Sequence, residues 1–333
     1  MRDQEAAPLI MRVFAQLADG RFRSGEELAK ELGVSRSAVW KAVKSLQELG
    51  ASVHAVRNRG YRLARGGEPL DAQRIRQALA REAREHVARI ETAWSVDSTN
   101  TILLERPNPS PGSSEVFLAE YQTAGRGRRG RAWLAPPGGA ICLSLSWTFR
   151  EVPEDLSALG LVIGVCAFRT LRHMGIEDAR LKWPNDLLIG DKKLGGVLIE
   201  LRAESSGPAC VVIGIGVNVA LGAELLKKIA ATGTAATDLA SAGLEALKRN
   251  AVAAALISCC VHGLAEFARE GLKPFIAEWR AADALRGRAV NVSGAAGISA
   301  GLARGIDLHG ALLVETPHGV KRFICGDVTV RPG

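Results

Sequence analysis

The 333-residue sequence has few of the features typical of secreted, membrane-spanning or zinc-bound proteins. Its six cysteines form no CxxC pair and its six histidines show neither HxxxH nor HExxH spacing, so we expect reduced thiols and no zinc site. The longest apolar stretches, 161–168 and 251–261, are shorter than the ~20 residues that span a bilayer. The N-terminal MRDQEAAPLI is charged where a secretory signal would be apolar. We therefore expect a cytoplasmic protein with no membrane contact.

Acidic residues are outnumbered, with 35 Asp+Glu against 43 Lys+Arg and a net charge of +8. The surplus is uneven, because residues 1–66 hold twelve basic and seven acidic residues. A second concentration consists of four arginines between 126 and 131, and the rest of the chain is nearly neutral. Such local surpluses indicate anionic partners, although net charge also favours solubility. The 47% hydrophobic content is that of a globular protein, and the length allows two or three domains.

The N-terminal segment has the pattern of three short helices followed by a hairpin. Apolar residues at helical spacing fill 9–17, Ser24 and Glu27 form a capping box before a second helix, and a third helix begins at Ser35. The alternating VHAVRNRGYRL then predicts two strands that turn at 58–60. This is a winged helix-turn-helix layout, and its basic third helix favours DNA binding over a helical dimerisation module. The candidate DNA-contacting residues are Ser35, Arg36, Ser37, Trp40, Lys41 and Lys44.

Beyond a linker at 64–73, the central region alternates strands and helices. Residues 71–86 have a helical pattern, and 90–100, 115–122, 141–149 and 210–219 have strand patterns. The polar DSTN at 97–100 ends the first of these strands, and its hydroxyls could simply cap the next helix. In the last strand, Gly214 and Gly216 would let a ligand approach the backbone.

The segment TAGRGRRGRAW satisfies GxGxxG at Gly125, Gly127 and Gly130. A dinucleotide-binding motif would have to open a helix, but here Trp-Leu-Ala-Pro-Pro-Gly-Gly follows, so we reject that interpretation. A solvated basic loop that contacts nucleic acid nonspecifically is an alternative. Alternating glycine and arginine better suits a mobile loop that closes on a phosphate-bearing ligand, because arginine offers forked donors to oxyanions.

A lysine, Lys182, ends a short predicted strand immediately before Trp-Pro-Asn-Asp. Pro184 restricts Trp183 to extended conformations, and a hairpin with Gly190-Asp191 at its tip follows. A lone lysine at a strand end is usually a surface residue, but this context is much more specific.

Together these motifs resemble those of the bacterial biotin protein ligases, in the bifunctional ligase–repressor class called BirA. The resemblance covers nearly the whole chain, through the winged helix, DSTN (97–100), YQTAGRGRRGRAW (121–133), LKWPNDLLI (181–189), KLGGVLIE (193–200), GIGVN (214–218) and GLARGIDLHGALLVET (301–316). Lipoate ligases share the fold without the pair GRGRRGR and KWPND.

The resemblance implies an α+β protein in three domains. These are a winged helix-turn-helix domain at 1–66, a mixed-sheet catalytic domain of the biotin/lipoate ligase fold at 67–283, and a C-terminal SH3-like β-barrel at 284–333. The barrel fits the short apolar runs and glycine turns of that segment.

The resemblance also implies the reaction. ATP activates biotin to biotinyl-5′-AMP, and a lysine of a biotin carboxyl carrier protein then takes the biotin; Mg²⁺ accompanies ATP. Lys182 and Arg128 are the implied catalytic residues. The implied biotin-binding residues are Ser98, Thr99, Asn100, Gln122, Arg126, Gly127, Arg128 and Lys182. The implied ATP- or adenylate-binding residues are Arg128, Arg131 and Asn218, while no Mg²⁺ ligand set is evident beyond the candidate Asp186.

The repressor half of the resemblance implies a homodimer on operator DNA when the adenylate is bound. One departure concerns the segment 220–240, which the family folds over adenine and which is small and polar here around 234–237. Two alternatives stay open: a transcription regulator that senses a ligand without turnover, and a lipoate ligase on the same fold.

Overall fold

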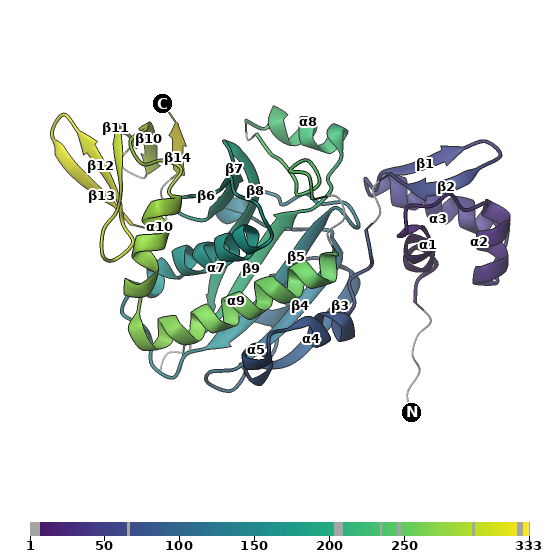
Figure 1. Cartoon of the computed structure of the whole chain (residues 1–333), viewed down its shortest axis with the longest axis horizontal. Helices are drawn as coiled ribbons and strands as arrows, with labels where there is room; N and C mark the ends of the chain where they lie inside the picture. The colour runs from purple at the N-terminus through teal and green to yellow at the C-terminus, as the bar shows by residue number, and fades with distance from the viewer. Residues whose placement is uncertain are drawn as a thin grey trace.

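The structure is a computed structural model that describes residues 7–64, 67–202, 209–233, 235–244, 248–294, 297–324 and 329–332. It consists of an N-terminal helical part with a small hairpin, a central part built on a large sheet, and a C-terminal sheet (Figure 1). Helices and strands do not alternate regularly along the chain and most neighbouring strands are antiparallel, which makes it an α+β protein.

The N-terminal part is a winged helix-turn-helix. Helices α1 (Leu9–Leu17), α2 (Gly25–Leu32) and α3 (Arg36–Glu48) precede the antiparallel strands β1 (Val53–Val56) and β2 (Gly60–Leu63). The predicted capping box is confirmed, because Glu27 N donates to Ser24 Oγ and Ser24 N donates to Glu27. The apolar positions of the three helices form one buried core, which includes Phe14, Leu28 and Val43. The apolar residues at helical spacing in the sequence are therefore the residues that form this core.

Among the described residues, seven strands form the central sheet in the order β3-β4-β5-β9-β8-β7-β6. Strands β3 and β4 are parallel and the other neighbours are antiparallel, so the sheet is mixed. The strands are β3 (Val87–Val96), β4 (Ser114–Gln122), β5 (Ala140–Thr148), β6 (Ala179–Lys182), β7 (Asp186–Ile189), β8 (Lys192–Arg202) and β9 (Cys210–Asn218).

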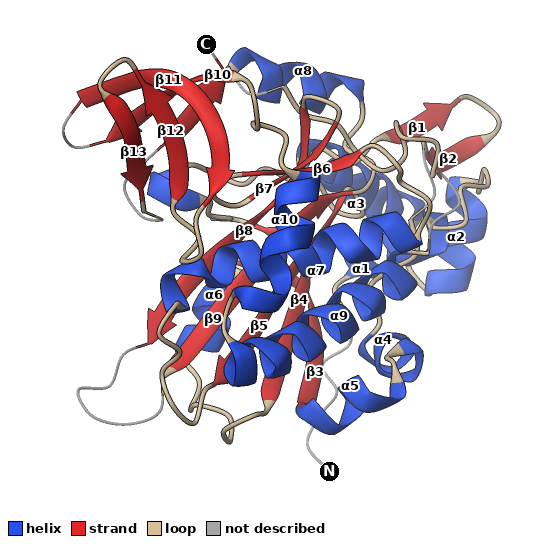
Figure 2. Cartoon of the chain, turned by 60° about the vertical axis from the view of Figure 1, so that its left-hand side comes forward, coloured by secondary structure: helices blue, strands red, loops and turns tan. Residues whose placement is uncertain are grey.

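Helices cover both faces of this sheet. Helices α7 (Leu159–His173) and α9 (Arg249–Glu270) pack together across one face (Figures 1 and 2). Helix α6 (Thr99–Leu104) packs against Phe117 and Val212 on the other face. The segments 156–173 and 249–270 are long and apolar enough to span a membrane by length and composition. In this fold they supply buried residues to the main core, such as Ile163 and Leu256, which accounts for their apolar character.

The region 71–86, predicted as one helical segment, forms two helices. Helix α4 (Ala72–Ala78) ends at Leu79, whose backbone is extended, and α5 (Arg81–His86) begins two residues later. At the break Ala80 N donates to the Ser258 hydroxyl of α9 at 3.0 Å. Both short helices pack against α9, so a tertiary contact overrides the continuous helical pattern.

The predicted linker is partly built into the central part. Leu70 N donates to Glu120 at 2.5 Å, and Asp71 N donates to Asn250 Oδ1 at 2.8 Å. Glu120 is in turn paired with Arg249 at 2.8 Å, with side chains only 4% and 1% exposed. A buried pair of this kind is stable only when further hydrogen bonds satisfy it, and here Arg249 also donates to the Ala140 carbonyl. The chain is thus fixed to the central part from Glu68 onward.

The C-terminal part, as far as the structure describes it, is an antiparallel sheet in the order β13-β12-β11-β10-β14. Its strands are β10 (Ala289–Gly294), β11 (Gly297–Ile306), β12 (Leu312–Thr316), β13 (Gly319–Phe323) and β14 (Thr329–Pro332), and α10 (Ile276–Ala282) leads into them. Arg280 of α10 donates to the Ile306 carbonyl at 2.7 Å, which fastens this C-terminal sheet to the central part.

The cysteines of the described chain are free thiols. Cys142, Cys166, Cys210 and Cys260 are buried and Cys259 is half-buried, as the apolar runs around them predict. Cys325 lies outside the described residues.

Candidate active site and DNA-binding face

A cleft of about 890 Å³ lies in the central part. It is lined by residues from the start of α6, the end of β4, the arginine-rich loop, the end of β6 and the strands β8 and β9. All ten predicted biotin- and nucleotide-binding residues line it: Ser98, Thr99, Asn100, Gln122, Arg126, Gly127, Arg128, Arg131, Lys182 and Asn218. Segments up to 120 positions apart in sequence thus meet in one cavity.

The hydroxyls of Ser98 and Thr99 do not cap α6. Ser98 is the N-cap residue, but its side chain makes no capping hydrogen bond. Thr99 N instead donates to Gln122 Oε1 at 2.8 Å, and Thr99 Oγ1 lies 3.2 Å from the same oxygen. The capping alternative is therefore wrong for these hydroxyls, because the side chains at the start of α6 are aimed at β4 and the cleft.

Two residues that the sequence analysis did not single out hold Asn100. The Ser144 hydroxyl of β5 lies 2.5 Å from Asn100 Oδ1 and 2.6 Å from Thr99 Oγ1. Glu200 of β8 accepts from Asn100 Nδ2 at 2.7 Å and from Arg126 at 3.2 Å. Glu200 could have been found in the sequence because it directly follows the apolar run Val-Leu-Ile, and a carboxylate beside buried apolar residues needs a partner. These contacts fix the amide of Asn100 from both sides.

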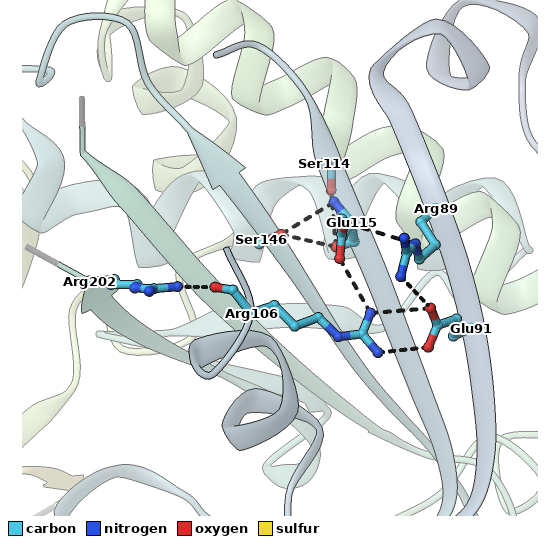
Figure 3. A network of polar contacts seen from close by, with 7 residues as sticks. All are labelled: Arg89, Glu91, Arg106, Ser114, Glu115, Ser146 and Arg202. Atoms are coloured by element: carbon cyan, nitrogen blue, oxygen red, sulfur yellow. Dashed lines mark hydrogen bonds and ion pairs between the residues drawn. The ribbon is translucent and has the colours of Figure 1, made fainter. Parts of the chain in front are cut away.

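The opposite end of α6 is fastened by a network of ion pairs (Figure 3). Arg106, just after the helix, pairs with Glu91 of β3 at 2.7 Å and with Glu115 of β4 at 3.3 Å, and its carbonyl accepts from Arg202. The hydrogen bonds from Arg106 lower the pKa of Glu91. The short helix that carries Thr99 and Asn100 is thereby held at both ends.

The arginine-rich loop forms a hairpin over the cleft. Gly127 N donates to the Arg131 carbonyl at 2.7 Å, and Trp133 N donates to the Gly125 carbonyl at 2.8 Å. The chain reverses at Arg129 and Gly130, both with positive φ, where glycine is the favoured residue. A single 3₁₀ turn (Arg128–Gly130) forms here and no α-helix follows it before β5, so the loop does not have the structure of a dinucleotide-binding motif.

The glycines of β9 are approached by the protein's own side chains. A Cβ at Gly214 would lie 2.6 Å from Asn100 Oδ1, and a Cβ at Gly216 would lie 2.6 Å from the Trp133 ring. We expected these glycines to let a ligand approach the backbone, but the space beside them is occupied by Asn100 and Trp133. Both glycines still line the cleft and shape its wall.

Lys182 lies at the end of β6, where the ladder pairs it with Asp186. The peptide bond between Trp183 and Pro184 is cis. Asp186 Oδ1 accepts from Lys193 Nζ at 2.5 Å, so this candidate metal ligand is already in an ion pair. Within the described ranges, no group of three or more His, Cys, Asp or Glu side chains could hold a metal ion.

The segment after β9 forms another wall. Helix α8 (Ala223–Ala231) is followed by residues that line the cleft, including Thr232, Gly233 and Ala236. Asn218 Nδ2 donates to the Thr237 carbonyl at 2.9 Å and so ties this segment to β9. Thr234 lies outside the described residues. Cys142 also lines the cleft, and burial raises the pKa of its thiol to about 11, so the thiol stays protonated.

The six candidate DNA-contacting residues lie on one exposed face of α3. Ser35 also serves the helix itself, because its hydroxyl accepts from Ala38 N at 3.2 Å. Trp40 is 52% exposed, and the Lys44 ammonium lies 5.6 Å from its ring centroid. An exposed tryptophan among cations suits a contact surface better than a solvated face.

Comparison with known proteins identifies the parts. Residues 93–218 match the Biotin/lipoate A/B protein ligase family, 11–62 match an HTH domain and 286–331 match the Biotin protein ligase C terminal domain. The chain is 37% identical to Bifunctional ligase/repressor BirA of Escherichia coli, over 96% of this chain and 97% of the relative. The corresponding protein of Bacillus subtilis is 31% identical over 96% and 97%.

Among solved structures, the fold is similar to biotin protein ligase from Aquifex aeolicus in complex with biotin and ATP. The TM-score is 0.63 and the identity 29%, and the match covers 74% of this chain and all of the other. Because the similarity to the ligase/repressors extends over nearly the whole sequence, the chain belongs to the BirA family of bifunctional ligase/repressors.

Proposed function

We propose that this protein activates biotin with ATP and transfers it to a lysine of a biotin carboxyl carrier protein. The observation that carries the proposal is the convergence of the ten candidate ligand residues on one cleft. ATP and the carrier protein are cytoplasmic reactants, so we place the protein in the cytoplasm. We assign the winged helix to 1–66, the catalytic domain to 67–283 and the C-terminal domain to 284–333.

The first step joins two anions. A biotin carboxylate oxygen attacks the α-phosphorus of ATP, the bond to the bridging oxygen breaks, and pyrophosphate leaves. Fixed cations lower the barrier to such a step by stabilising charge on the carboxylate and phosphoryl oxygens. We assign this role to Lys182 at the end of β6 and Arg128 in the hairpin, which line the same cleft.

In the second step the carrier lysine amine attacks the acyl carbon, and AMP leaves. The adenylate is a mixed anhydride that water would hydrolyse, so it must be covered until the carrier arrives. We assign this covering role to the hairpin at 125–133, in which Glu200 holds Arg126. Arg131 lines the same cleft and would contact the phosphate. Ser98, Thr99, Asn100, Gln122 and Gly127 would bind biotin, and Asn218 with the segment after α8 would face the nucleotide.

Mg²⁺ would come with the nucleotide. The side chains present fit an ion carried mainly by the phosphates, because Asp186 is the candidate carboxylate and Lys193 already occupies one of its oxygens. When bound, the ion would neutralise charge on the pyrophosphate.

The exposed cationic face of α3 supports a second activity, repression of transcription from operator DNA. We propose that the adenylate promotes a homodimer that binds the operator through Ser35, Arg36, Ser37, Trp40, Lys41 and Lys44. A gel-shift titration with and without biotin plus ATP tests DNA binding and its coupling to the adenylate together.

The ligase proposal is tested by biotin-dependent exchange of labelled pyrophosphate into ATP. We expect exchange with pure protein, biotin, ATP and Mg²⁺, and none without biotin. Replacing biotin with lipoate in the same assay distinguishes the two ligases, because a lipoate ligase would exchange pyrophosphate with lipoate and not with biotin. Absence of exchange with either acid, together with ligand-dependent DNA binding that survives Lys182→Ala, would identify a sensor without turnover.

A further inference from the structure

Lys182 lies on a strand at the edge of the central sheet, so its position depends on what holds that edge. One side of β6 pairs with β7, through Leu181 with Leu187 and Lys182 with Asp186. On the other side Ala284 N donates to the Leu181 carbonyl at 2.8 Å, and Leu181 pairs with Asp283. The residues that hold this outer side belong to the connection into the C-terminal sheet. Part of the same connection lines the cleft, at Ala284, Leu285 and Arg288.

The residue after Lys182 makes a second link to the C-terminal sheet. The Trp183 side chain is 1% exposed, and its Nε1 donates to the Gly310 carbonyl at 3.0 Å. A buried indole N–H without an acceptor is unfavourable, so this bond specifies where the ring lies. Trp147 offers a contrast: it is equally buried, but its Nε1 has no hydrogen-bond partner among the described residues.

The acceptor is itself fixed. Gly310 ends the turn that joins β11 to β12, with φ at +81°. A Cβ at this position would lie 2.8 Å from Leu161 Cδ1 and 2.9 Å from Ala158 Cβ, so the turn is packed directly against the start of α7. Asp307 Oδ1 accepts from both His309 N and Ala311 N at 2.9 Å, which holds the shape of the turn. The Gly310 carbonyl is therefore a rigid acceptor.

We propose that the C-terminal sheet positions Lys182 through this bond, with Trp183 as the positioning residue. Lysine is a long flexible side chain, so its ammonium is placed well only if its backbone is fixed. The Gly310 carbonyl holds the Trp183 ring, and the ring fixes the backbone that Trp183 shares with Lys182. This inference rests on the proposed function, because it assumes that Lys182 binds the biotin carboxylate.

The test measures the dissociation constant of biotin by titration calorimetry on the full chain. Trp183→Phe removes the N–H donor and keeps an aromatic ring. Trp147→Phe is the matched control, because it makes the same change at an equally buried site that has no such bond and does not line the cleft. Both changes are also made in a Lys182→Ala background, since a residue that acts through Lys182 loses its effect when the lysine is gone. Gly310→Ala, which displaces the acceptor, gives a second approach to the bond.

We expect Trp183→Phe to weaken biotin binding about tenfold in the native background and less than about twofold in the Lys182→Ala background. Trp147→Phe should lower the thermal midpoint but leave the dissociation constant within about twofold of the native value. Gly310→Ala should weaken binding in the same direction as Trp183→Phe.

Native-like biotin binding by Trp183→Phe would overturn the inference, as would an equal weakening in both backgrounds. A native chain that binds no biotin would instead refute the proposed function. The two failures are thus distinguishable.

Discussion

Glu200 connects two side chains that arrive at the cleft from different segments. It accepts from Asn100 Nδ2 at 2.7 Å and from Arg126 at 3.2 Å, and the Asn100 amide is also held by Ser144. The charge of Arg126 is therefore partly balanced before any ligand binds.

At Arg128, we expect Arg128→Gly to release the adenylate about tenfold faster or more, because the hairpin would lose a cation that covers it. Freed adenylate acylates exposed lysines, so biotin should appear on unrelated proteins mixed with the enzyme. Labelling of bystander albumin on a streptavidin blot measures this. Arg150→Gly, which removes an exposed arginine outside the cleft, is the control. Slow modification confined to the carrier would contradict the covering role.

Asp283 gives a pH-dependent prediction. Burial raises the pKa of its carboxyl to about 6, and its Oδ2 has no hydrogen-bond partner among the described residues. The folded protein thus disfavours the charged form, so stability falls as pH rises from about 4 to about 6 and stays lower above that. We expect Asp283→Asn to stabilise the protein at pH 7.5 by up to about 3 kcal/mol, and to have little effect near pH 4.

Thermal unfolding of the native protein and Asp283→Asn at the two pH values measures this difference. Asp307→Asn is a control for which we expect the opposite change in stability. Burial raises the pKa of Asp307, but hydrogen bonds from the Ala311 and His309 amides and from the Arg322 side chain together lower it by more, so the pKa is lowered overall. That substitution should destabilise at pH 7.5. A stabilisation by Asp283→Asn that is equal at both pH values would rule out the carboxyl titration as its cause.

Helix α3 is the element that carries the candidate DNA face. If Lys41 contacts a phosphate, Lys41→Ala should weaken binding to all sequences and reduce the slope of log K against log salt by about one. Fluorescence anisotropy at several salt concentrations measures the slope. Lys273→Ala removes the same charge from an exposed position on the central part and should leave the slope unchanged. An unaltered slope for Lys41→Ala would place the DNA elsewhere.

Elements whose signals are local could be predicted from the sequence. The Ser24–Glu27 capping box and the strand that ends at Lys182 both depend on neighbouring residues, and both are confirmed. The break between α4 and α5 depends on Ser258, which is 178 positions away from its partner Ala80. Glu200 and Ser144 likewise act on residues 100 and 44 positions distant. Side-chain partners at such separations leave no periodic trace in the sequence.

At the scale of the whole molecule, the cleft and the DNA face belong to separable parts. The cleft is lined by residues from 98 onward, and the chain from Glu68 to Asp71 is anchored to α9 and β4. We expect a chain of residues 67–333 to keep pyrophosphate exchange within about tenfold of the full protein and to lose DNA binding.

A shorter chain of residues 72–333 is the matched control for this truncation. It also lacks Leu70 and Asp71, so Glu120 loses a hydrogen bond in a buried site and the thermal midpoint should fall. Complete loss of exchange by 67–333 would show that the parts are not separable.

The winged helix nevertheless lies against segments that continue into the cleft. The ring of Phe14 lies 5.5 Å from the ring of Trp94, and Trp94 is four residues before the cleft residue Ser98. Phe14 Cζ also lies 2.9 Å from the position that a Cβ would take at Gly138, which is five residues after the cleft residue Trp133. A binding event that shifts these contacts is subject to thermodynamic reciprocity. If bound adenylate lowers the dissociation constant for operator DNA by some factor, bound operator must lower the dissociation constant for the adenylate by the same factor. A protein bound to its operator would then have a lower dissociation constant for the adenylate, so the DNA would act as a ligand that favours the activated acid.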